Sequence, residues 1–512
     1  MAEHLSALVE QMHRPHFYPH SVEKIEVIQT HASIVFLTGA YAYKLKKPVD
    51  FGFLNYSTLA QRKHFCEQEL QINQKVAAAL YLEVLPIAKQ GEQFVLGGTG
   101  EAVEYVLKMR QFPQENLFLN MFEQGKLTEA HLNDLGKIVA NFHAQAQTND
   151  YIRRFGKVSK IRESIEENYQ QTQKYIGIVQ TDEQYQETKQ FTDTFLTQKE
   201  LFQKRRATDK IKECHGDLHL KNICFWQNKI QLFDRIEFNE AFRFVDVMYD
   251  VAFTVMDLEA RHGHNLGNAF LNSYLEETGD WEGLQVLPFY LCRQAYVRAK
   301  VNSFLLDEEE AQQVTQTAAD YYRLAWSYTK MNRGKIILMS GLSGSGKSTV
   351  AQWLARRTGA IQIRSDAVRK HLAGIPVHQR GGSELYTPPM NDRTYTRLLE
   401  LGNMLAGAGY PVILDAKFDR CVWRQKAIAL AQAQSFPLQI LYCTAPVEVL
   451  RNRLHHRQDI SDATADLLAA QQAAAESFTE AEQPYVVTVN TAEAWTESNF
   501  LEQVRDGGRF SS

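Results

Sequence analysis

The segment HGDLHLKN at residues 215–222 holds the residue types that phosphoryl transfer to a hydroxyl requires. Such a reaction needs a carboxylate to take the acceptor's proton and metal ions to neutralise the phosphates. Asp217 is the candidate base, and Asn222, in the same loop, is a candidate metal ligand. The alternative is that Asp217 only caps a turn and His215 packs in a core. We interpret His215 and His219 as structural rather than chemical.

A second carboxylate follows this loop after two short apolar runs. Ile223–Trp226 and Ile230–Phe233 flank a turn at Gln227–Lys229, which predicts a β-hairpin. The hairpin brings the chain back to its start, so Asp234 is expected beside Asn222, where both could hold Mg²⁺. The loop and the returning hairpin together predict a magnesium nucleotide site.

A nucleotide site of this kind also needs a cation for the phosphates and an acid that holds the cation. In the predicted strand AYAYKLKKP, Lys44 and Lys46 share one face. Lys44 is the first candidate, with Lys46 in reserve. In the predicted helix HFCEQELQIN, Glu69 is the expected partner, with Glu67 as the second choice. A surface charge is the alternative for each of these residues taken alone.

A second nucleotide motif occurs far along the chain, in GLSGSGKST at residues 341–349. It follows the apolar run KIILMS and precedes the amphipathic TVAQWLARRTG, which is the strand–loop–helix context that a P-loop requires. Lys347 is expected to reach the β- and γ-phosphates, and Ser348 to bind Mg²⁺. A flexible linker is the alternative. The predicted nucleotide-binding residues here are Gly341, Ser343, Gly344, Ser345, Gly346, Lys347, Ser348 and Thr349.

Residues after the P-loop predict an acceptor side. Asp366 follows a second short strand in IQIRSDAVRKHLAG and could accept a substrate proton. Asp415 ends the apolar run YPVILD and is the Walker-B-like candidate for the metal's water shell. Arg453 and Arg457 share one predicted helix face, where they would suit a lid that closes on the transferred phosphate. A solvated basic helix is the alternative for these two arginines.

Three basic residues lie near Asp366 in the same segment. Arg364, Arg369 and Lys370 could hold an anionic group of the acceptor. An exposed helix face is an equally good interpretation of these side chains.

The elements that must position these residues form three segments. Strand-like runs and one helix near Leu59–Leu80 fill the first, and helical periodicity prevails from Thr128 onward. A new domain starts near Arg333. We therefore predict an N-lobe at 1–110, a helical C-lobe with the catalytic loop at 111–330, and a P-loop kinase domain at 333–507. The fold class is multidomain: an α+β two-lobed protein-kinase-like domain, then an α/β P-loop NTPase domain with a parallel sheet.

Composition excludes several other classes. The 512 residues carry 56 Lys and Arg against 60 Asp and Glu, a net charge of -4, which argues against a dedicated nucleic-acid binder. No apolar run is long enough for a membrane helix, and the N-terminal residues do not form a signal peptide. The cytoplasm is the expected compartment. The six scattered cysteines form neither a disulfide framework nor a zinc site, and oligomeric state stays open.

The sequence HGDLHLKN, followed by LFDRIEFN and FRFVDVMYDVAF, resembles the aminoglycoside phosphotransferase-like branch of the protein-kinase fold over about residues 20–328. The resemblance implies Asp217 as catalytic base, Asn222 and Asp234 as metal ligands, and Lys44 as the phosphate lysine. Asp246 and Asp250, four apart on a predicted helix, match positions that brace the catalytic region.

Residues 333–490 resemble the P-loop kinases grouped with gluconate kinase, adenylylsulfate kinase and zeta toxin. The pairing resembles bacterial proteins described as bifunctional aminoglycoside phosphotransferase/ATP-binding proteins. It implies ATP and Mg²⁺ at both sites and small-molecule hydroxyl acceptors whose identity the sequence does not give. The leading hypothesis is a bifunctional ATP-dependent phosphotransferase. The alternatives are a kinase-like domain coupled to a nucleotide-gated regulatory P-loop ATPase, and a protein or toxin kinase.

Overall fold

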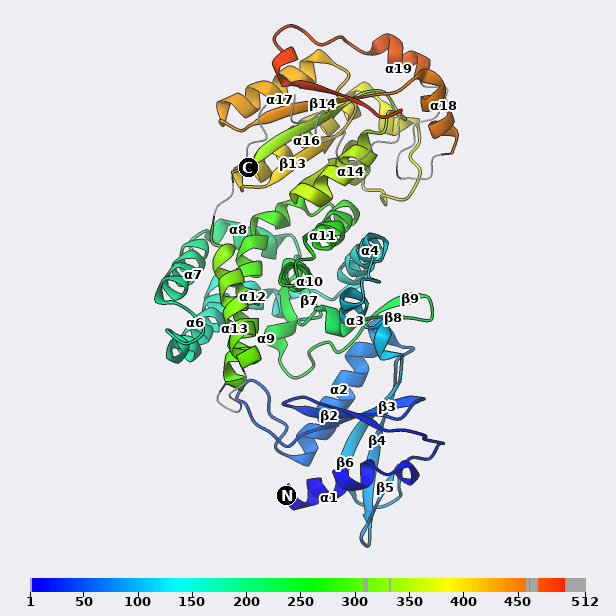
Figure 1. Cartoon of the computed structure of the whole chain (residues 1–512), viewed down its shortest axis with the longest axis vertical. Helices are drawn as coiled ribbons and strands as arrows, with labels where there is room; N and C mark the ends of the chain where they lie inside the picture. Colours follow the sequence, from blue (N-terminus) through cyan, green and yellow to red (C-terminus); the bar gives the residue numbers. More distant parts are fainter. Residues whose placement is uncertain (1, 307–311, 331–332, 457–459, 461–467, 493–512) are drawn as a thin grey trace. The chain divides into compact units, whose positions relative to one another are not determined.

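The computed structural model describes residues 2–306, 312–330, 333–456, 460 and 468–492 (Figure 1). Its contacts divide the chain into two compact units. The first comprises residues 1–128, 142–170 and 193–257, and the second comprises residues 129–141, 171–192 and 258–512. The two units are described separately below.

The first unit begins with a six-stranded antiparallel sheet in the order β1-β2-β3-β6-β4-β5. Alternation along β3 sends Tyr43 and Leu45 into the apolar core that includes helix α1, and Lys44 and Lys46 toward α2. A capping box between Thr58 and Gln61 starts α2. The elements are α1 (Ala2–Met12), β1 (Glu26–Gln29), β2 (Ser33–Leu37), β3 (Tyr41–Lys46), α2 (Leu59–Ala77), β4 (Tyr81–Gln90), β5 (Gln93–Leu96) and β6 (Ala102–Arg110).

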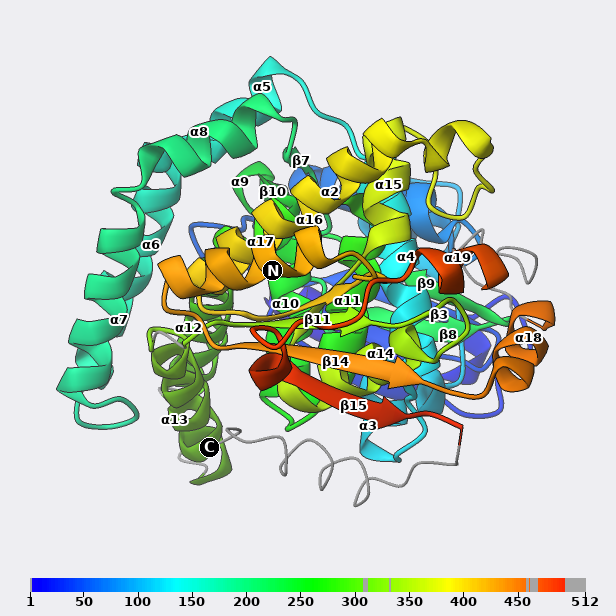
Figure 2. The ribbon, with the colours of Figure 1, turned by 90° about the horizontal axis from the view of Figure 1, so that it is seen from above.

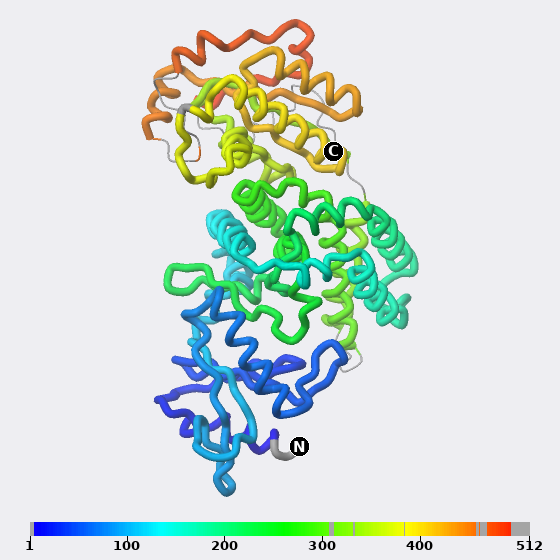
Figure 3. The backbone as a smooth tube through the Cα atoms, turned by 180° about the vertical axis from the view of Figure 1, so that it is seen from behind, coloured from blue at the N-terminus to red at the C-terminus, as the bar shows by residue number. Residues whose placement is uncertain are grey.

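Helices dominate from residue 118 onward, as the backbone trace in Figure 3 shows. Two small antiparallel sheets, β7 with β10 and β8 with β9, interrupt them and flank the catalytic-loop sequence. The elements are α3 (Phe118–Glu123), α4 (Glu129–Gln145), α5 (Asp150–Arg153), α6 (Val158–Thr172), α7 (Asp182–Phe195), α8 (Lys199–Ala207), β7 (Ile211–Glu213), β8 (Ile223–Trp226), β9 (Lys229–Leu232), α9 (Glu240–Arg243), β10 (Phe244–Asp246), α10 (Val247–Glu259), α11 (His264–Thr278), α12 (Leu287–Leu305) and α13 (Gln312–Ser327).

The second unit contains a five-stranded parallel sheet in the order β12-β13-β11-β14-β15. Its central strands are buried on both faces, as parallel strands covered by helices should be. Ile413 joins the core with α14, while Leu414 contacts Gly402 of α16 on the opposite face. Figure 2 shows the ribbon of this sheet together with α14 and α16. The elements are β11 (Lys335–Ser340), α14 (Lys347–Thr358), β12 (Ile361–Arg364), α15 (Ser365–Ala373), α16 (Pro388–Gly407), β13 (Pro411–Asp415), α17 (Cys421–Ala433), β14 (Leu438–Thr444), α18 (Val447–His455), α19 (Leu468–Ala474) and β15 (Val486–Asn490).

This architecture confirms the predicted fold class. A β-rich lobe with one long helix precedes a helical lobe, and a parallel α/β P-loop domain follows. Within the described part of the chain, no helix has both the length and the apolar character that crossing a membrane requires.

Candidate functional site

The catalytic-loop sequence forms a compact turn between β7 and β8. The Asn222 side-chain amide donates to the Asp217 backbone carbonyl at 2.9 Å and to its Oδ2 at 3.1 Å. Because the nitrogen of a planar amide points toward Asp217, the Asn222 oxygen is directed away from that carboxylate. His219 Nε2 lies 3.3 Å from the same Asp217 oxygen. Asn222 and His219 thus hold the Asp217 side chain in place, and the Asn222 side chain presents an oxygen that suits a hard cation.

His215 is a structural residue of this loop. It is fully buried, its Nε2 contacts the Phe233 carbonyl at 2.9 Å, and its Nδ1 accepts the backbone N–H of Asp217 at 3.3 Å. Burial lowers the pKa of His215 to about 4, so the imidazole is neutral at neutral pH. The ring therefore joins the loop to the end of the β8–β9 hairpin without carrying charge.

Asp250, on the buried helix α10, fixes the start of the loop. Its two carboxylate oxygens accept the backbone N–H groups of His215 at 2.7 Å and Gly216 at 2.8 Å. Burial opposes ionisation, but the hydrogen bond from His143 lowers the pKa of Asp250 and keeps it ionised. Gly216 has φ +88°, and a Cβ there would lie 2.6 Å from the Phe242 carbonyl, so only glycine fits.

Two further side chains of α10 hold the rest of the loop. Thr254 donates to the Leu218 carbonyl at 2.7 Å, and Asp257 accepts the Leu220 N–H at 3.0 Å. Together with Asp250 they follow helical spacing and form one face of α10, which acts as a template for the loop.

Asp246 corrects one expectation. It was predicted on the same helix as Asp250, but it ends strand β10. There it accepts two hydrogen bonds from Arg205, at 2.8 and 2.6 Å, inside the protein. Asp246 therefore stabilises this region through a bidentate ion pair with Arg205, whereas Asp250 binds the backbone of the loop directly.

The β8–β9 hairpin returns the chain to Asn222, as predicted. Ile223 pairs with Leu232, and the Phe233 N–H donates to the Asn222 carbonyl at 3.0 Å. Asp234 follows directly with φ +62°, and its N–H donates to the Tyr81 hydroxyl at 2.9 Å. Its side chain is 41% exposed, so the carboxylate remains accessible at the end of the hairpin.

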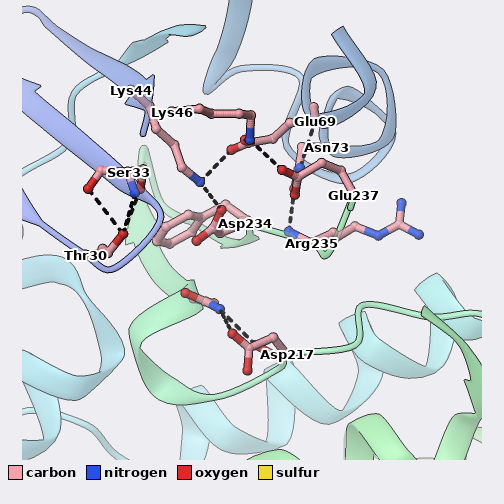
Figure 4. A network of polar contacts seen from close by, with 12 residues as sticks. Thr30, Ser33, Lys44, Lys46, Glu69, Asn73, Asp217, Asp234, Arg235 and Glu237 are labelled. Carbon is pink, nitrogen blue, oxygen red and sulfur yellow. Dashed lines mark hydrogen bonds and ion pairs between the residues drawn. The ribbon is translucent and has the colours of Figure 1, made fainter. Parts of the chain in front are cut away.

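Lys44, Glu69 and Asp234 form a continuous ionic chain (Figure 4). The Lys44 ammonium donates to Glu69 Oε1 at 2.8 Å and to Asp234 Oδ1 at 2.5 Å. Glu69 is fully buried, which would raise its pKa, but Lys44 and Lys46 lower the pKa to about 2. Burial would lower the pKa of Lys44, yet Asp234 and Glu69 raise it well above its usual value. Lys44 and Glu69 are therefore both charged at neutral pH.

Lys46 also contacts Glu69, a contact that the sequence did not predict. Its ammonium donates to Glu69 Oε2 at 2.7 Å, to Glu237 Oε1 at 2.5 Å and to the Tyr56 hydroxyl at 3.2 Å. Lys46 is 2% exposed, whereas the Lys44 side chain is 14% exposed. The two lysines are thus not interchangeable, because only Lys44 contacts the partly exposed carboxylate of Asp234. Glu67, the second choice, lies on the exposed face of α2, 3.9 Å from Lys63.

The P-loop sequence connects β11 to α14, which begins at Lys347. Gly341 has φ +131°, and a Cβ there would lie 2.4 Å from the Cys443 carbonyl, so the loop passes tightly over the sheet. The Ser345 hydroxyl is buried and has no hydrogen-bond partner among the described residues. A tight glycine loop with an unsatisfied hydroxyl at a helix N-terminus fits a bound phosphate.

Two other P-loop groups, on Lys347 and Ser343, contact protein atoms in this structure. The Lys347 ammonium donates to the Leu342 carbonyl at 2.7 Å, and the Ser343 N–H donates to the Gln471 side chain at 3.1 Å. Asp415 is buried at the end of β13, with Gln362 Nε2 2.9 Å from its Oδ2. Gln362 Nε2 also lies 3.5 Å from the Ser348 carbonyl, so one amide joins the two predicted metal-side residues.

The predicted acceptor-side residues are mostly held by protein partners. Asp366 pairs with Arg369 at 2.8 Å, and Arg364 lies 3.6 Å from Glu276 and 4.0 Å from Asp415. Burial raises the pKa of Glu276, a carboxyl that the sequence did not indicate.

The structure supports neither of the two roles that the sequence suggested for Lys370, an anion-binding residue and an exposed helix residue. It is 2% exposed, and its ammonium donates to two backbone carbonyls, those of Val377 at 2.9 Å and Ile460 at 2.8 Å. It therefore joins segments of the chain and is neither part of an exposed helix face nor placed to hold an anion.

Arg453 does not project from a lid in this structure. Its guanidinium donates to the Thr491 carbonyl at 2.6 Å and hydroxyl at 3.0 Å, and lies 3.4 Å from the Gly344 carbonyl. Thr491 in turn donates to the Ser345 carbonyl at 2.9 Å. Arg453 and Thr491 thus stabilise the P-loop by contacts with the backbone carbonyls of Gly344 and Ser345. Arg457 lies outside the described residues.

Fold and site geometry define the class of the protein: a two-lobed kinase-like part followed by a P-loop domain. A family model described as an AAA domain matches residues 336–478. An uncharacterized protein of Mycobacterium tuberculosis (strain ATCC 25618 / H37Rv) is 30% identical over 455 residues, which cover 87% of this chain and 89% of the relative. The chain therefore belongs to the same family as this mycobacterial protein.

Two solved structures show similarity to parts of the chain. A gluconokinase from Sinorhizobium meliloti 1021 is 24% identical, covers 35% of this chain and 91% of its own, and has a TM-score of 0.25. A choline/ethanolamine kinase family protein from Mesorhizobium loti is 10% identical, covers 64% of this chain and 95% of its own, and has a TM-score of 0.40.

Proposed function

We propose that the chain is an ATP-dependent phosphotransferase with two sites, each of which transfers the γ-phosphoryl group of ATP to a hydroxyl of a small molecule. The observation that carries this proposal is the ionic chain of Lys44, Glu69 and Asp234 beside the Asp217–Asn222 loop. A phosphate-binding cation, a metal-binding carboxylate and a candidate base are thereby present in one unit.

At the first site, each residue has a distinct task. Asp217 takes the proton of the acceptor hydroxyl, while Lys44, held by Glu69, binds the phosphates. The oxygens of Asn222 and Asp234 are hard ligands that would hold Mg²⁺. Bound Mg²⁺ supplies neutralisation of the charge on the transferred phosphoryl group. The fixed loop keeps these groups in place before the substrate arrives, which is how positioning lowers the barrier.

At the second site, the Lys347 ammonium and P-loop backbone N–H groups bind the phosphates, once Lys347 and Ser343 exchange their acceptors on Leu342 and Gln471 for phosphate oxygens. Ser348 and Asp415 would hold Mg²⁺, and Asp366 is the proposed base. Arg453 supports the loop, so any charge stabilisation by an arginine falls to another residue. Small-molecule acceptors are proposed for both sites, with no nucleic acid or membrane involved.

The test is phosphate transfer from γ-labelled ATP to a metabolite extract, with products identified by mass spectrometry. We expect Asp217→Ala to lower one transfer activity by about 10³-fold, because a general base contributes on that order, and to leave the other unchanged. Lys347→Ala should do the reverse, and the double variant should transfer nothing. Arg451→Ala, an exposed substitution on α18, serves as control.

Three outcomes would overturn the proposal. ATP turnover at the P-loop without any acceptor, with a partner bound only in the ATP state, would indicate a regulatory ATPase. Label that appears on a polypeptide or a nucleotide sugar would indicate a protein or toxin kinase. No change in either variant would exclude both proposed sites.

A further inference from the structure

Glu69 is shared by two lysines that lie at different depths (Figure 4). Its Oε1 accepts from Lys44 at 2.8 Å and its Oε2 accepts from Lys46 at 2.7 Å. A fully buried carboxylate with one cation on each oxygen has a single orientation. The position of Lys44 therefore depends on a second ion pair behind it.

The three hydrogen bonds of Lys46 saturate its ammonium group. An ammonium has three N–H donors, and those of Lys46 meet oxygens of Glu69, Glu237 and Tyr56 inside the protein. Lys44 makes two such bonds among the described residues, to Glu69 and Asp234. Lys44 thus has a donor for a phosphate, whereas Lys46 has none.

Glu237 connects this ion pair to the metal side of the site. It lies three residues after Asp234, and the Tyr56 hydroxyl donates to its Oε1 at 2.5 Å. Between them, the Arg235 N–H donates to the Asn73 side chain at 2.9 Å, and Asn73 donates to the Glu69 carbonyl at 2.9 Å. The segment 234–237 is therefore joined to helix α2 through Asn73 and to strand β3 through the Lys46–Glu237 pair.

We propose that Lys46, Glu237 and Tyr56 form a positioning unit that keeps Glu69 and the Asp234 segment in place when a nucleotide binds. This inference rests on the proposed function of the first site. When Lys44 binds phosphate and Asp234 binds a metal, their mutual contact at 2.5 Å is given up. Lys46 then keeps one oxygen of Glu69 bound, so that Glu69 still directs Lys44. Lys46 is a positioning residue, because all three of its N–H donors bind protein oxygens and none is left for the nucleotide.

The experiment uses the full chain with Lys347→Ala, so that nucleotide binding reports on the first site. Mg·ATP affinity is measured by titration calorimetry, and folding by thermal unfolding without nucleotide. We expect Lys46→Met to raise the Kd for Mg·ATP about tenfold, as loss of a supporting contact does. In a Lys44→Met background, Lys46→Met should add less than about twofold, because it acts through Lys44.

Controls separate positioning from general destabilisation. Lys63→Met removes an exposed lysine of helix α2, which also carries Glu69, and should leave the Kd unchanged. Glu237→Gln, which keeps the shape of the side chain, should raise the Kd in the same direction and covers the case in which Lys46→Met does not fold.

Three results would overturn the inference. One is a lowered melting temperature with an unchanged Kd in Lys46→Met and Glu237→Gln. Another is full additivity of Lys46→Met with Lys44→Met. If the Lys347→Ala parent binds no Mg·ATP, the proposed function of the first site fails and the inference fails with it.

Discussion

The two candidate nucleotide sites are built in different ways. The first collects side chains from β3, α2, the catalytic loop and the segment after β9, and stabilises them by buried ion pairs and by α10. The second is one contiguous loop whose backbone forms the cradle, closed by Gly341 and supported by Thr491. The first site therefore depends on charges that must remain paired, and the second on backbone conformations that must remain accessible. Variants that disturb one property should affect one site only.

The largest effect is expected from Gly341→Ala. A Cβ at this position would lie 2.4 Å from a backbone carbonyl, at φ +131°. Steric overlap and backbone strain together should destabilise the second unit by about 4 kcal/mol and lower its nucleotide affinity about 100-fold. Calorimetric titration with ATP and thermal unfolding check both numbers.

Gly359→Ala is the matched control for that prediction. Gly359 has φ +67° in the same domain, with nothing within 4 Å of a Cβ, so the cost should be about 1 kcal/mol. Transfer that depends on Asp217 should persist in both variants. Loss of that transfer in Gly341→Ala would show that the two sites are not independent.

A smaller effect is expected from acid, through His215 of the first site. The folded protein holds the pKa of His215 at about 4, against 6.5 when it is unfolded, so the unfolded state binds more protons between these values. The stability is present above pH 6.5 and is lost as the pH falls toward 4. Between pH 7 and 4.5 the loss is about 2 kcal/mol.

Urea unfolding at the two pH values measures this loss. In His215→Gln the difference should shrink by about 2 kcal/mol. The pKa of Glu69 is about 2 in the folded protein, so its contribution to stability is lost only below its ordinary pKa of 4.5. Glu69 therefore does not contribute to the change in stability between pH 7 and 4.5. The P-loop sequence contains no histidine or carboxylate, so affinity at the second site should not follow His215. An unchanged pH dependence in His215→Gln would contradict the assignment.

The smallest effect concerns Arg453. If it supports the loop through Thr491, Arg453→Ala should cost about 1 kcal/mol of stability and raise the second-site Kd about threefold, with kcat nearly unchanged. A lid arginine that stabilises the transferred phosphate would instead lower kcat by about 10³-fold. Steady-state kinetics with Arg451→Ala as the exposed control decides between the two roles.

The sequence predicted those features that are local in the chain. The hairpin that follows Asn222 and the strand, loop and helix around Lys347 are contiguous, and the structure confirms both. The fold class is confirmed as well, because element periodicity is also a local property. The domain boundaries and the chemical roles of the site residues remain predictions.

Contacts between distant segments were not predictable. Glu237 lies in the segment LFDRIEFN but was given no role there, and Tyr56 lies in no motif; their importance follows from meeting Lys46 inside the fold. The same limit explains the errors. Lys370 was treated as an anion-binding or exposed cation because sequence does not show which carbonyls lie nearby, and Asp246 was placed on a helix that starts one residue later.

During protein synthesis, the second candidate site can be completed only after strand β15 has been made. This strand pairs with β14 in parallel register, and Thr491, just beyond it, supports the P-loop. Every residue of the first site, by contrast, has been translated by residue 257. The residues of the first candidate site are therefore synthesised more than two hundred residues before Thr491 of the second, so the first can form earlier if the parts of the chain fold in the order in which they emerge from the ribosome.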